Sequence, residues 1–166
     1  MDYENWKAIY VEKTDEKRNV KLSGAITSTL NNKNDPTYEK RDKSARDFYE
    51  QAVQNRESFI KNIAQNGNIS RQSAEKIFDH IFVEKHNLRS GFRKFDPDYD
   101  RAESFKRIID GEDIQVHDLI MLKHECLELG LMRRYNYDYD KAHRITEHKY
   151  NYKAALEKWL KERGGW

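Results

Sequence analysis

Apolar side chains recur at helical spacing along most of the chain after residue 41. The segments with this pattern are 42–54, 57–64, 69–85, 102–110, 115–132, 142–149 and 154–161. An apolar residue at every third or fourth position places these side chains on one face of a helix, where they can be buried. The pattern therefore predicts a mainly α, compact multi-helix domain around the helix 115–132.

Residues that favour helix ends stand at the expected boundaries. Ser and Asp accept hydrogen bonds from the first-turn N–H groups, and glycine adopts the left-handed backbone conformation that ends many helices. The candidate N-caps are Ser70, Asp98 or Asp100, Asp113, and Asp138 or Asp140, and Gly111 is the expected end of the helix before it. These signals support separate helices joined by short connections.

Two short stretches carry some strand character, Trp6–Lys13 near the N-terminus and Gly91–Phe95. We expect a small hairpin formed from the N-terminal region and the second stretch. The loop Asn31–Thr37 is the best candidate for a soft boundary because it is polar and contains a proline. We therefore divide the chain into a polar N-terminal segment, residues 1–37, with short strands as a small β element, and a helical part, residues 38–166, within a single domain.

The composition is polar for a folded protein, with 37% hydrophobic and 36% charged residues, but 20 aromatic side chains favour a folded core. The net charge of +2 says little about partners. A single cysteine, Cys126, cannot form an internal disulfide, and we expect it to be a small core residue. No apolar run approaches the length of about 18 residues that a membrane helix needs, so no membrane partner is expected.

The most informative feature is a polar stripe on the otherwise apolar helix 115–132. This helix carries His117, His124, Glu125 and Glu128. At about 100° per residue, His117, His124 and Glu128 share one face. Buried polar groups must be satisfied by partners or used for chemistry, so this stripe is the first candidate site.

A second histidine–glutamate pair follows later in the chain. His143 and Glu147 are four residues apart on a predicted helix, a spacing at which the two side chains can hydrogen-bond. Tyr150, Asn151 and Tyr152 come directly afterwards. If the last helices pack back on the central one, we expect His143 to approach His124 and Glu128.

Such a cluster suits acid/base cleavage of a phosphodiester without a metal ion or other cofactor. His117 and His124 would be the acid and base, and Glu128 would orient His124. His143 and Tyr150 would complete the phosphate site, and Arg93 is a candidate phosphate contact. The sequence contains no phosphate-binding loop of the Walker type, no dinucleotide-binding glycine pattern and no nucleophile elbow.

Two other interpretations of the same residues stay open. The zinc-protease motif HExxH is absent because position 128 is Glu, but His124, Glu128 and His143 still make a His/Glu/His set that a metal-dependent hydrolase could use. Alternatively, the histidine–glutamate contacts are structural cross-links between helices. The domain would then be a non-enzymatic module that binds a protein or nucleic acid.

Three motifs resemble a known type of domain. They are FDPDYD at residues 95–100, the HD…HE…E…LM pattern of the central helix, and AH…YNY at residues 142–152. Together they resemble the C-terminal domain shared by Gram-positive phage minor head proteins and bacterial polymorphic toxins, including LXG-type effectors. The resemblance covers roughly residues 23–161.

The resemblance implies a toxin or effector domain, and such toxin domains are commonly nucleases. We expect an RNase rather than a DNase, with a nucleic acid as substrate and a cognate immunity protein as partner. Its place of action would be the cytoplasm of a target cell, reached as part of a larger secreted effector or in a virion. By position, the resemblance marks His117, His124, Glu125, Glu128, His143, Tyr150, Asn151 and Tyr152 as family-like polar residues. Their roles follow from the side-chain chemistry: the expected catalytic residues are His117, His124, Glu128 and His143, and the expected substrate-binding residues are Glu125, Tyr150, Asn151, Tyr152 and Arg93.

Overall fold

The computed structural model describes residues 33–163, and this part of the chain is mainly α, as the sequence predicts. Its elements are α2 (Tyr38–Gln54), α3 (Arg56–Asn66), α4 (Arg71–Phe78), the π-helical turn η1 (Asp79–Val83), β1 (His86–Leu88), β2 (Gly91–Arg93), α5 (Tyr99–Asp110), α6 (Val116–Tyr135), α7 (Tyr139–Lys149) and α8 (Tyr152–Glu162). The expected strand at Trp6–Lys13 and most of the segment 1–37 lie outside the described residues.

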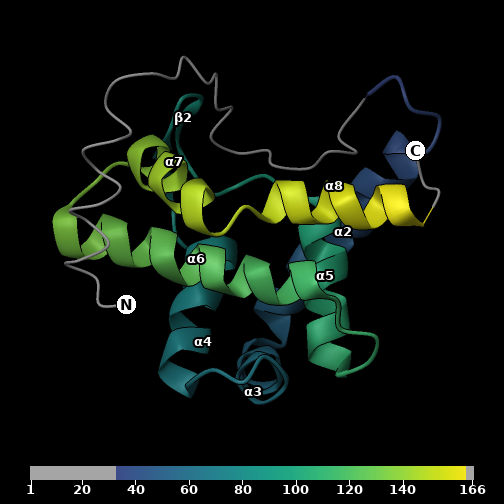
Figure 1. Cartoon of the computed structure of the whole chain (residues 1–166), viewed down its shortest axis with the longest axis horizontal. Helices are drawn as coiled ribbons and strands as arrows, with labels where there is room; N and C mark the ends of the chain where they lie inside the picture. Colours follow the sequence, from purple (N-terminus) through teal and green to yellow (C-terminus); the bar gives the residue numbers. More distant parts are fainter. Residues whose placement is uncertain (1–32, 164–166) are drawn as a thin grey trace.

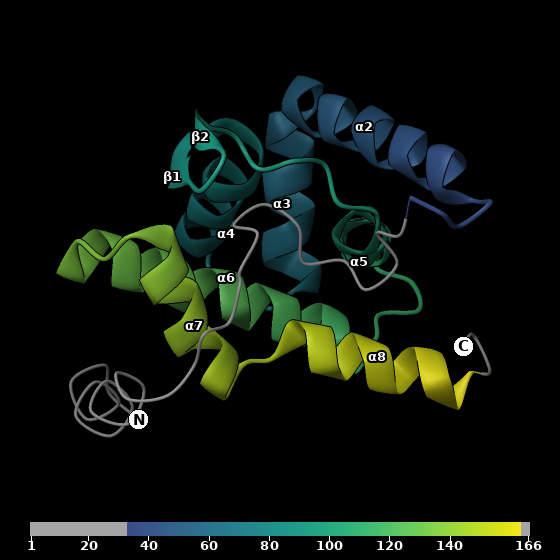
Figure 2. The ribbon, with the colours of Figure 1, turned by 90° about the horizontal axis from the view of Figure 1, so that it is seen from above.

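The 20-residue helix α6 is the centre of the arrangement (Figure 1). Helices α7 and α8 lie along one side of it, whereas α3 and α4 lie on the other side. Seen from above, α2 lies farther from α6, beyond α3 and α5 (Figure 2). Any side chain on a buried face of α6 is therefore surrounded by neighbouring helices.

Most of the expected caps are confirmed. Ser70, Asp98 and Asp138 each accept a hydrogen bond from a first-turn backbone N–H, and Gly111 ends α5 with a φ of 70°. Asp113 is a correction, because the N-cap of α6 is Gln115 and the carboxylate of Asp118 closes a capping box with it. These caps fix where α6 begins and thereby the direction of its polar side chains.

The expected hairpin exists with a different partner. Among the described residues, β2 pairs antiparallel with β1, with His86 opposite Arg93. Only two residues separate the strands, and Gly91 has the positive φ of 122° that a tight connection requires. The strand within Gly91–Phe95 thus has a local partner, and the expected N-terminal partner lies outside the described residues.

Cys126 is another correction, because it is exposed rather than a core residue. It lies on the solvent-facing stripe of α6 with Leu119, Lys123 and Arg133, which are also exposed. These positions are spaced by three, four or seven residues and therefore share one face of the helix. The apolar neighbours of Cys126 in the sequence point to other sides.

The core consists of two apolar clusters that include different segments along α6. The larger one includes Ile77, Phe105, Met121 and Leu122, and the smaller one contains Leu127, Leu131, Ala142 and Ile145. The buried polar residues His124, Glu125 and Glu128 lie where these two sections of α6 meet. The helix thus carries a polar layer between two apolar ones.

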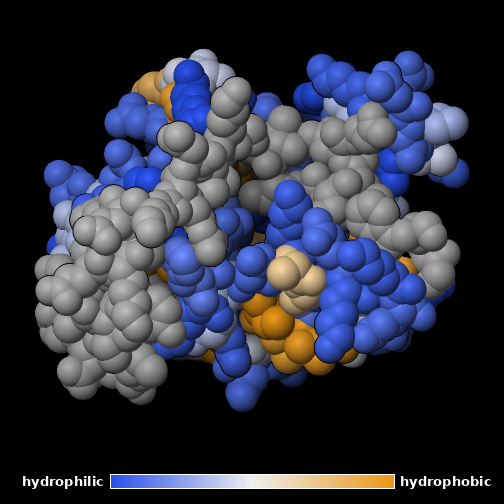
Figure 3. All heavy atoms as spheres, turned by 45° about the horizontal axis from the view of Figure 1, so that its top comes forward, coloured by the Kyte–Doolittle hydropathy of each residue, from blue (hydrophilic) through white to orange (hydrophobic). Residues whose placement is uncertain are grey.

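The residues coloured on the face in Figure 3 are mostly hydrophilic, and hydrophobic ones gather near its lower edge. This agrees with the low mean hydropathy of the chain, −1.09. None of the helices in residues 33–163 has the length and apolar character that crossing a membrane requires.

Candidate metal centre in a buried histidine and glutamate cluster

The carboxylate of Glu128 is the centre of the polar layer. Its Oε2 atom lies 2.7 Å from Nδ1 of His143 and 3.2 Å from Nε2 of His124, and its Oε1 atom lies 2.9 Å from Nε2 of His80. The four residues come from η1, α6 and α7. Glu128 therefore connects three separate elements, and the expected approach of His143 to His124 and Glu128 is present.

The outer nitrogens of His124 and His143, the two histidines that face Oε2 of Glu128, are held by groups that only accept hydrogen bonds. Nδ1 of His124 donates to the backbone carbonyl of Tyr150 at 2.8 Å, and Nε2 of His143 donates to the carboxylate of Glu147 at 3.1 Å. These acceptors fix one proton of each ring on its outer nitrogen. In the neutral form of each imidazole, the lone pair of the inner nitrogen must then point toward Glu128.

Three ligand atoms consequently converge on one small space. Nε2 of His124 and Nδ1 of His143 lie 3.2 Å apart, and Oε2 of Glu128 lies within 3.2 Å of both. Ligands around a tetrahedral zinc ion with bonds of about 2.0–2.1 Å are about 3.3 Å from one another. The set of two imidazoles and one carboxylate thus has the composition of a divalent metal site, with outer hydrogen bonds of the kind that orient metal-bound histidines. Two of its three separations match that spacing, whereas Nδ1 of His143 and Oε2 of Glu128, at 2.7 Å, would have to move apart by about 0.6 Å to bind one ion.

Without an ion, protons must occupy the same space. Burial lowers the pKa of His143, but its hydrogen bonds to Glu128 and Glu147 outweigh burial and raise this pKa to about 10. Burial raises the pKa of Glu128, but bonds from His124, His143 and His80 hold it well below its usual range. The metal-free cluster therefore contains a protonated His143 between two carboxylates.

A buried ion pair lies beside the cluster. Arg101 of α5 approaches Glu125 of α6 to 3.0 Å, and each residue is less than 5% exposed. Glu125 also lies 3.8 Å from Nε2 of His80. Arg101 therefore balances the charge of Glu125. Glu125 was expected to contact substrate, but it is buried and does not lie at the surface.

His117 does not join the cluster. Its Nε2 atom accepts a hydrogen bond from Arg107 at 3.0 Å and lies 3.2 Å from Asp118, and its ring contacts Trp159. Because Arg107 can only donate, His117 is neutral, with its proton on Nδ1. Of the expected acid and base, only His124 lies at Glu128, and the other histidines there are His143 and His80.

The expected substrate-binding residues are placed apart from one another. Tyr150 reaches His124 through its backbone carbonyl, Asn151 caps α8 with its side chain, and the hydroxyl of Tyr152 bonds Ser104 in the core. Arg93 forms an ion pair with Asp96 at 2.6 Å. Of these four residues, only Tyr150 thus touches the cluster, through its main chain.

The cluster is closed to solvent. His124, Glu128 and His143 are each at most 3% exposed. A groove of about 450 Å³ lies nearby, and its lining includes Ile81, Phe82, Phe95 and Pro97. The ring of Phe95 lies 5.0 Å from that of Tyr139, which stacks on His143 at 5.3 Å. These two rings separate the groove from the polar layer.

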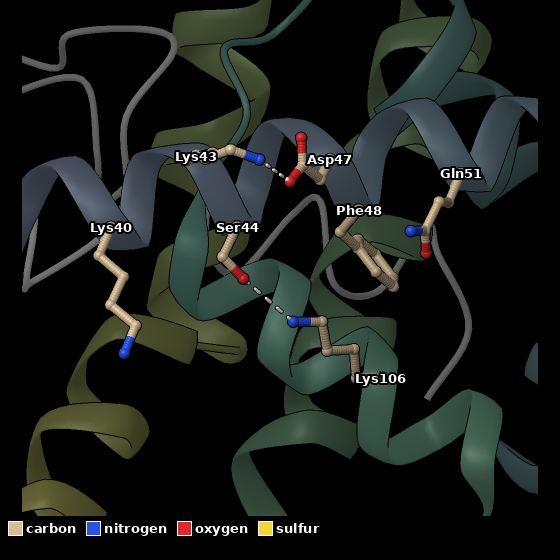
Figure 4. Close-up of a pocket in the computed structure, with 7 residues that line it drawn as sticks. All are labelled: Lys40, Lys43, Ser44, Asp47, Phe48, Gln51 and Lys106. Carbon is tan, nitrogen blue, oxygen red and sulfur yellow. Dashed lines mark hydrogen bonds and ion pairs between the residues drawn. The ribbon is translucent and has the colours of Figure 1, made fainter.

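A second groove has a cationic lining and lies elsewhere. Lys40, Lys43 and Lys106 contribute to it from α2 and α5 (Figure 4). Lys43 bonds Asp47 at 2.6 Å, and Lys106 bonds Ser44 at 3.3 Å and Glu103 at 2.7 Å. Its lining shares no residue with the histidine and glutamate cluster.

Two residues at the site, His80 and Arg101, were not among those expected from the sequence. His80 is separated from Glu128 by 48 positions, so no local spacing connects them. One signal was present, because His80 follows the apolar stripe formed by Ile77 and Phe78 and precedes Ile81. A histidine inside such a stripe needs a buried partner.

No protein-family model matches the chain, and comparisons with curated proteins and with solved structures likewise found no match. Function is therefore inferred from the side-chain geometry and from the motifs of the chain.

Proposed function

We propose that this chain is a metal-dependent hydrolase domain of the toxin or effector class, with a divalent ion held by His124, Glu128 and His143. One observation carries the proposal. Both histidines have their outer N–H groups fixed by obligate acceptors, so the neutral rings direct their inner lone pairs and the Glu128 carboxylate at the same point. A divalent cation satisfies all three atoms at once, whereas protons require a charged imidazole in the interior.

The chemistry follows from the number of protein ligands. Three protein ligands would leave a coordination position for water on the ion, and a zinc-type ion would supply a water with its pKa lowered to about 7. Glu147 and the carbonyl of Tyr150 hold the two imidazoles in place, and His80 holds the other oxygen of Glu128. The resemblance to toxin domains makes a phosphodiester, with RNA preferred, the expected substrate.

The groove beside Phe95 is the proposed approach for substrate. Phe95 and Tyr139 are the rings between that groove and His143, so their side chains must move before a phosphate group can reach the ion. This proposal differs from metal-free acid/base cleavage in using His143 rather than His117 beside His124, and in requiring an ion.

The test uses inducible expression in bacteria and cleavage of labelled RNA and DNA by the purified chain, with Zn²⁺, Mn²⁺ or Mg²⁺ added after chelation. We expect wild type to be toxic and to cleave RNA only with a metal ion, and His143→Ala to lose both properties. His148→Ala is the matched control, since His148 is an exposed histidine on the same helix. Cleavage that survives chelation, or equal behaviour of wild type and His143→Ala, would contradict the proposal.

A non-enzymatic binding module is the second candidate, and the burial of the cluster favours it. Glu128 cross-links η1, α6 and α7 in the interior, as a purely structural network would. In that case His143→Ala would lower the free energy of unfolding, and wild type would show no cleavage with any of the three ions.

A further inference from the structure

We propose a second divalent metal site formed by His80, Glu84 and His86, at the end of the π-helical turn and the start of β1. One ligand atom from each residue lies within 4.8 Å of those from the other two. The site uses none of the three residues proposed to bind the catalytic ion, so it stands whether or not that ion binds.

The hydrogen bonds of His80 leave one of its nitrogens without a partner. Its Nε2 atom donates to Oε1 of Glu128 at 2.9 Å, because the carboxylate can only accept. Its Nδ1 atom therefore carries a lone pair, and this atom is buried without a hydrogen-bond partner. A fully buried imidazole nitrogen without a partner is costly, and a metal ion would satisfy it.

His86 is held in the matching tautomer. Its Nε2 atom donates to the backbone carbonyl of His80 at 2.8 Å, which leaves the lone pair on Nδ1. The ring is fixed on its other side by Phe95, which stacks on it at 4.4 Å, and it meets the ring of His80 edge to face at 4.6 Å. Both imidazoles are thus pre-oriented with Nδ1 available as a ligand.

Glu84 supplies the carboxylate and the route to solvent. It is only partly buried, and its Oε1 atom accepts from Arg133 at 2.6 Å, so Oε2 is the oxygen left for an ion. The turn before it is π-helical, with Glu84 N–H donating to the carbonyl of Asp79. π-Helical turns are rare and occur often at functional sites, and this one brings Glu84 near His80.

The ligand set selects the kind of ion. Two imidazoles and one carboxylate favour zinc or another first-row divalent ion over calcium or magnesium, which prefer oxygen. Glu128, His80 and the ion would form a carboxylate–histidine–metal series, in which the carboxylate orients the ligand histidine. The two proposed ions would then be linked through the two oxygens of Glu128.

Equilibrium dialysis of the full chain against Zn²⁺, followed by elemental analysis, tests this site. We expect about two zinc ions per chain in wild type, and one in Glu84→Gln and in His86→Gln. The second variant keeps an amide N–H that can donate to the carbonyl of His80. Glu112→Gln, which removes an exposed carboxylate elsewhere, should keep both ions, and circular dichroism checks that each variant is folded.

Each outcome separates the two proposals. If Glu84→Gln and His86→Gln bind as many ions as wild type, the second site is wrong. If they lose one ion while His124→Ala loses none, the second site stands and the catalytic ion is wrong. Both proposals are supported if the second-site variants and His124→Ala each lose one ion and the double variant His124→Ala, Glu84→Gln binds none.

Discussion

Nδ1 of His143 lies 2.7 Å from Oε2 of Glu128, so an imidazole of α7 is fixed to a carboxylate of α6 in the interior of the protein. Nε2 of His80 donates to the same carboxylate, and Nε2 of His124 faces it. A single buried group thus holds the position of two helices and a π-helical turn. Its removal tests how much of the fold depends on the polar layer.

For the metal-free protein, we expect Glu128→Gln to lower the free energy of unfolding by about 3–5 kcal/mol, because it leaves buried imidazole groups without their counter-charge. Urea denaturation followed by circular dichroism measures this change. Glu162→Gln, at an exposed position of α8, should differ from wild type by less than about 0.5 kcal/mol. A change of the same small size for Glu128→Gln would show that the network contributes little.

Asp118 has two roles that one substitution removes together. Its carboxylate accepts from the backbone N–H of Gln115 at 2.8 Å and forms two bonds of 2.7 Å with Arg107. We expect Asp118→Ala to destabilise the protein by about 3–5 kcal/mol, since it leaves the half-buried Arg107 unpaired as well as uncapping α6. In a double-mutant cycle, adding Arg107→Ala should cost much less than it does in wild type. Purely additive changes would exclude the coupling.

The pH dependence of stability should show that the folded state prefers a neutral His117. Burial lowers the pKa of His117 below its ordinary value of 6.5, Asp118 opposes this, and Arg107 adds to it. The folded state thus prefers the neutral ring, so this histidine lowers stability as the pH falls below about 6.5 and has no such effect above it. We expect the stability difference between wild type and His117→Gln to shift in favour of the variant between pH 7.5 and 5. Urea denaturation at several pH values measures this, and a constant difference would contradict the assignment.

Metal binding should release protons. The pKa of His143 is about 10 in the metal-free protein, so Nδ1 carries a proton at pH 7.5 that a bound ion must displace. We expect zinc affinity at this site to rise with pH up to about 10. Calorimetry in buffers of different ionisation enthalpy, using Glu84→Gln to remove the second site, should report about one released proton per ion. Binding without proton release would show that His143 is not a ligand.

The sequence was sufficient for the helices and for part of the cluster. Periodic apolar positions and capping residues located α4, α5, α6 and α7 within a few residues, because these signals are local. The meeting of His143 with His124 and Glu128 could also be expected, since both pairs lie on amphipathic helices that are close in the chain. Apolar periodicity and capping residues thus predict the individual helices well, because each helix depends on them directly.

The remaining features depend on contacts between distant residues. His80 reaches Glu128 across 48 positions, and His117 bonds Arg107 of α5 rather than His124 on its own helix. Packing decides which face of α6 contacts which neighbouring helix. The seven-residue spacing of His117 and His124 therefore could not predict their separate partners. The exposure of Cys126 has the same cause, because an apolar neighbourhood in sequence does not define one side of a helix.

Crystallography with anomalous scattering at the zinc edge tests the central claim most directly. In crystals grown with Zn²⁺, we predict a peak within about 2.0–2.2 Å of Nε2 of His124, Nδ1 of His143 and an oxygen of Glu128. If zinc-saturated crystals show no peak there and Glu128 stays directly hydrogen-bonded to both histidines, the cluster is a structural network and the proposed metal-dependent hydrolase is wrong.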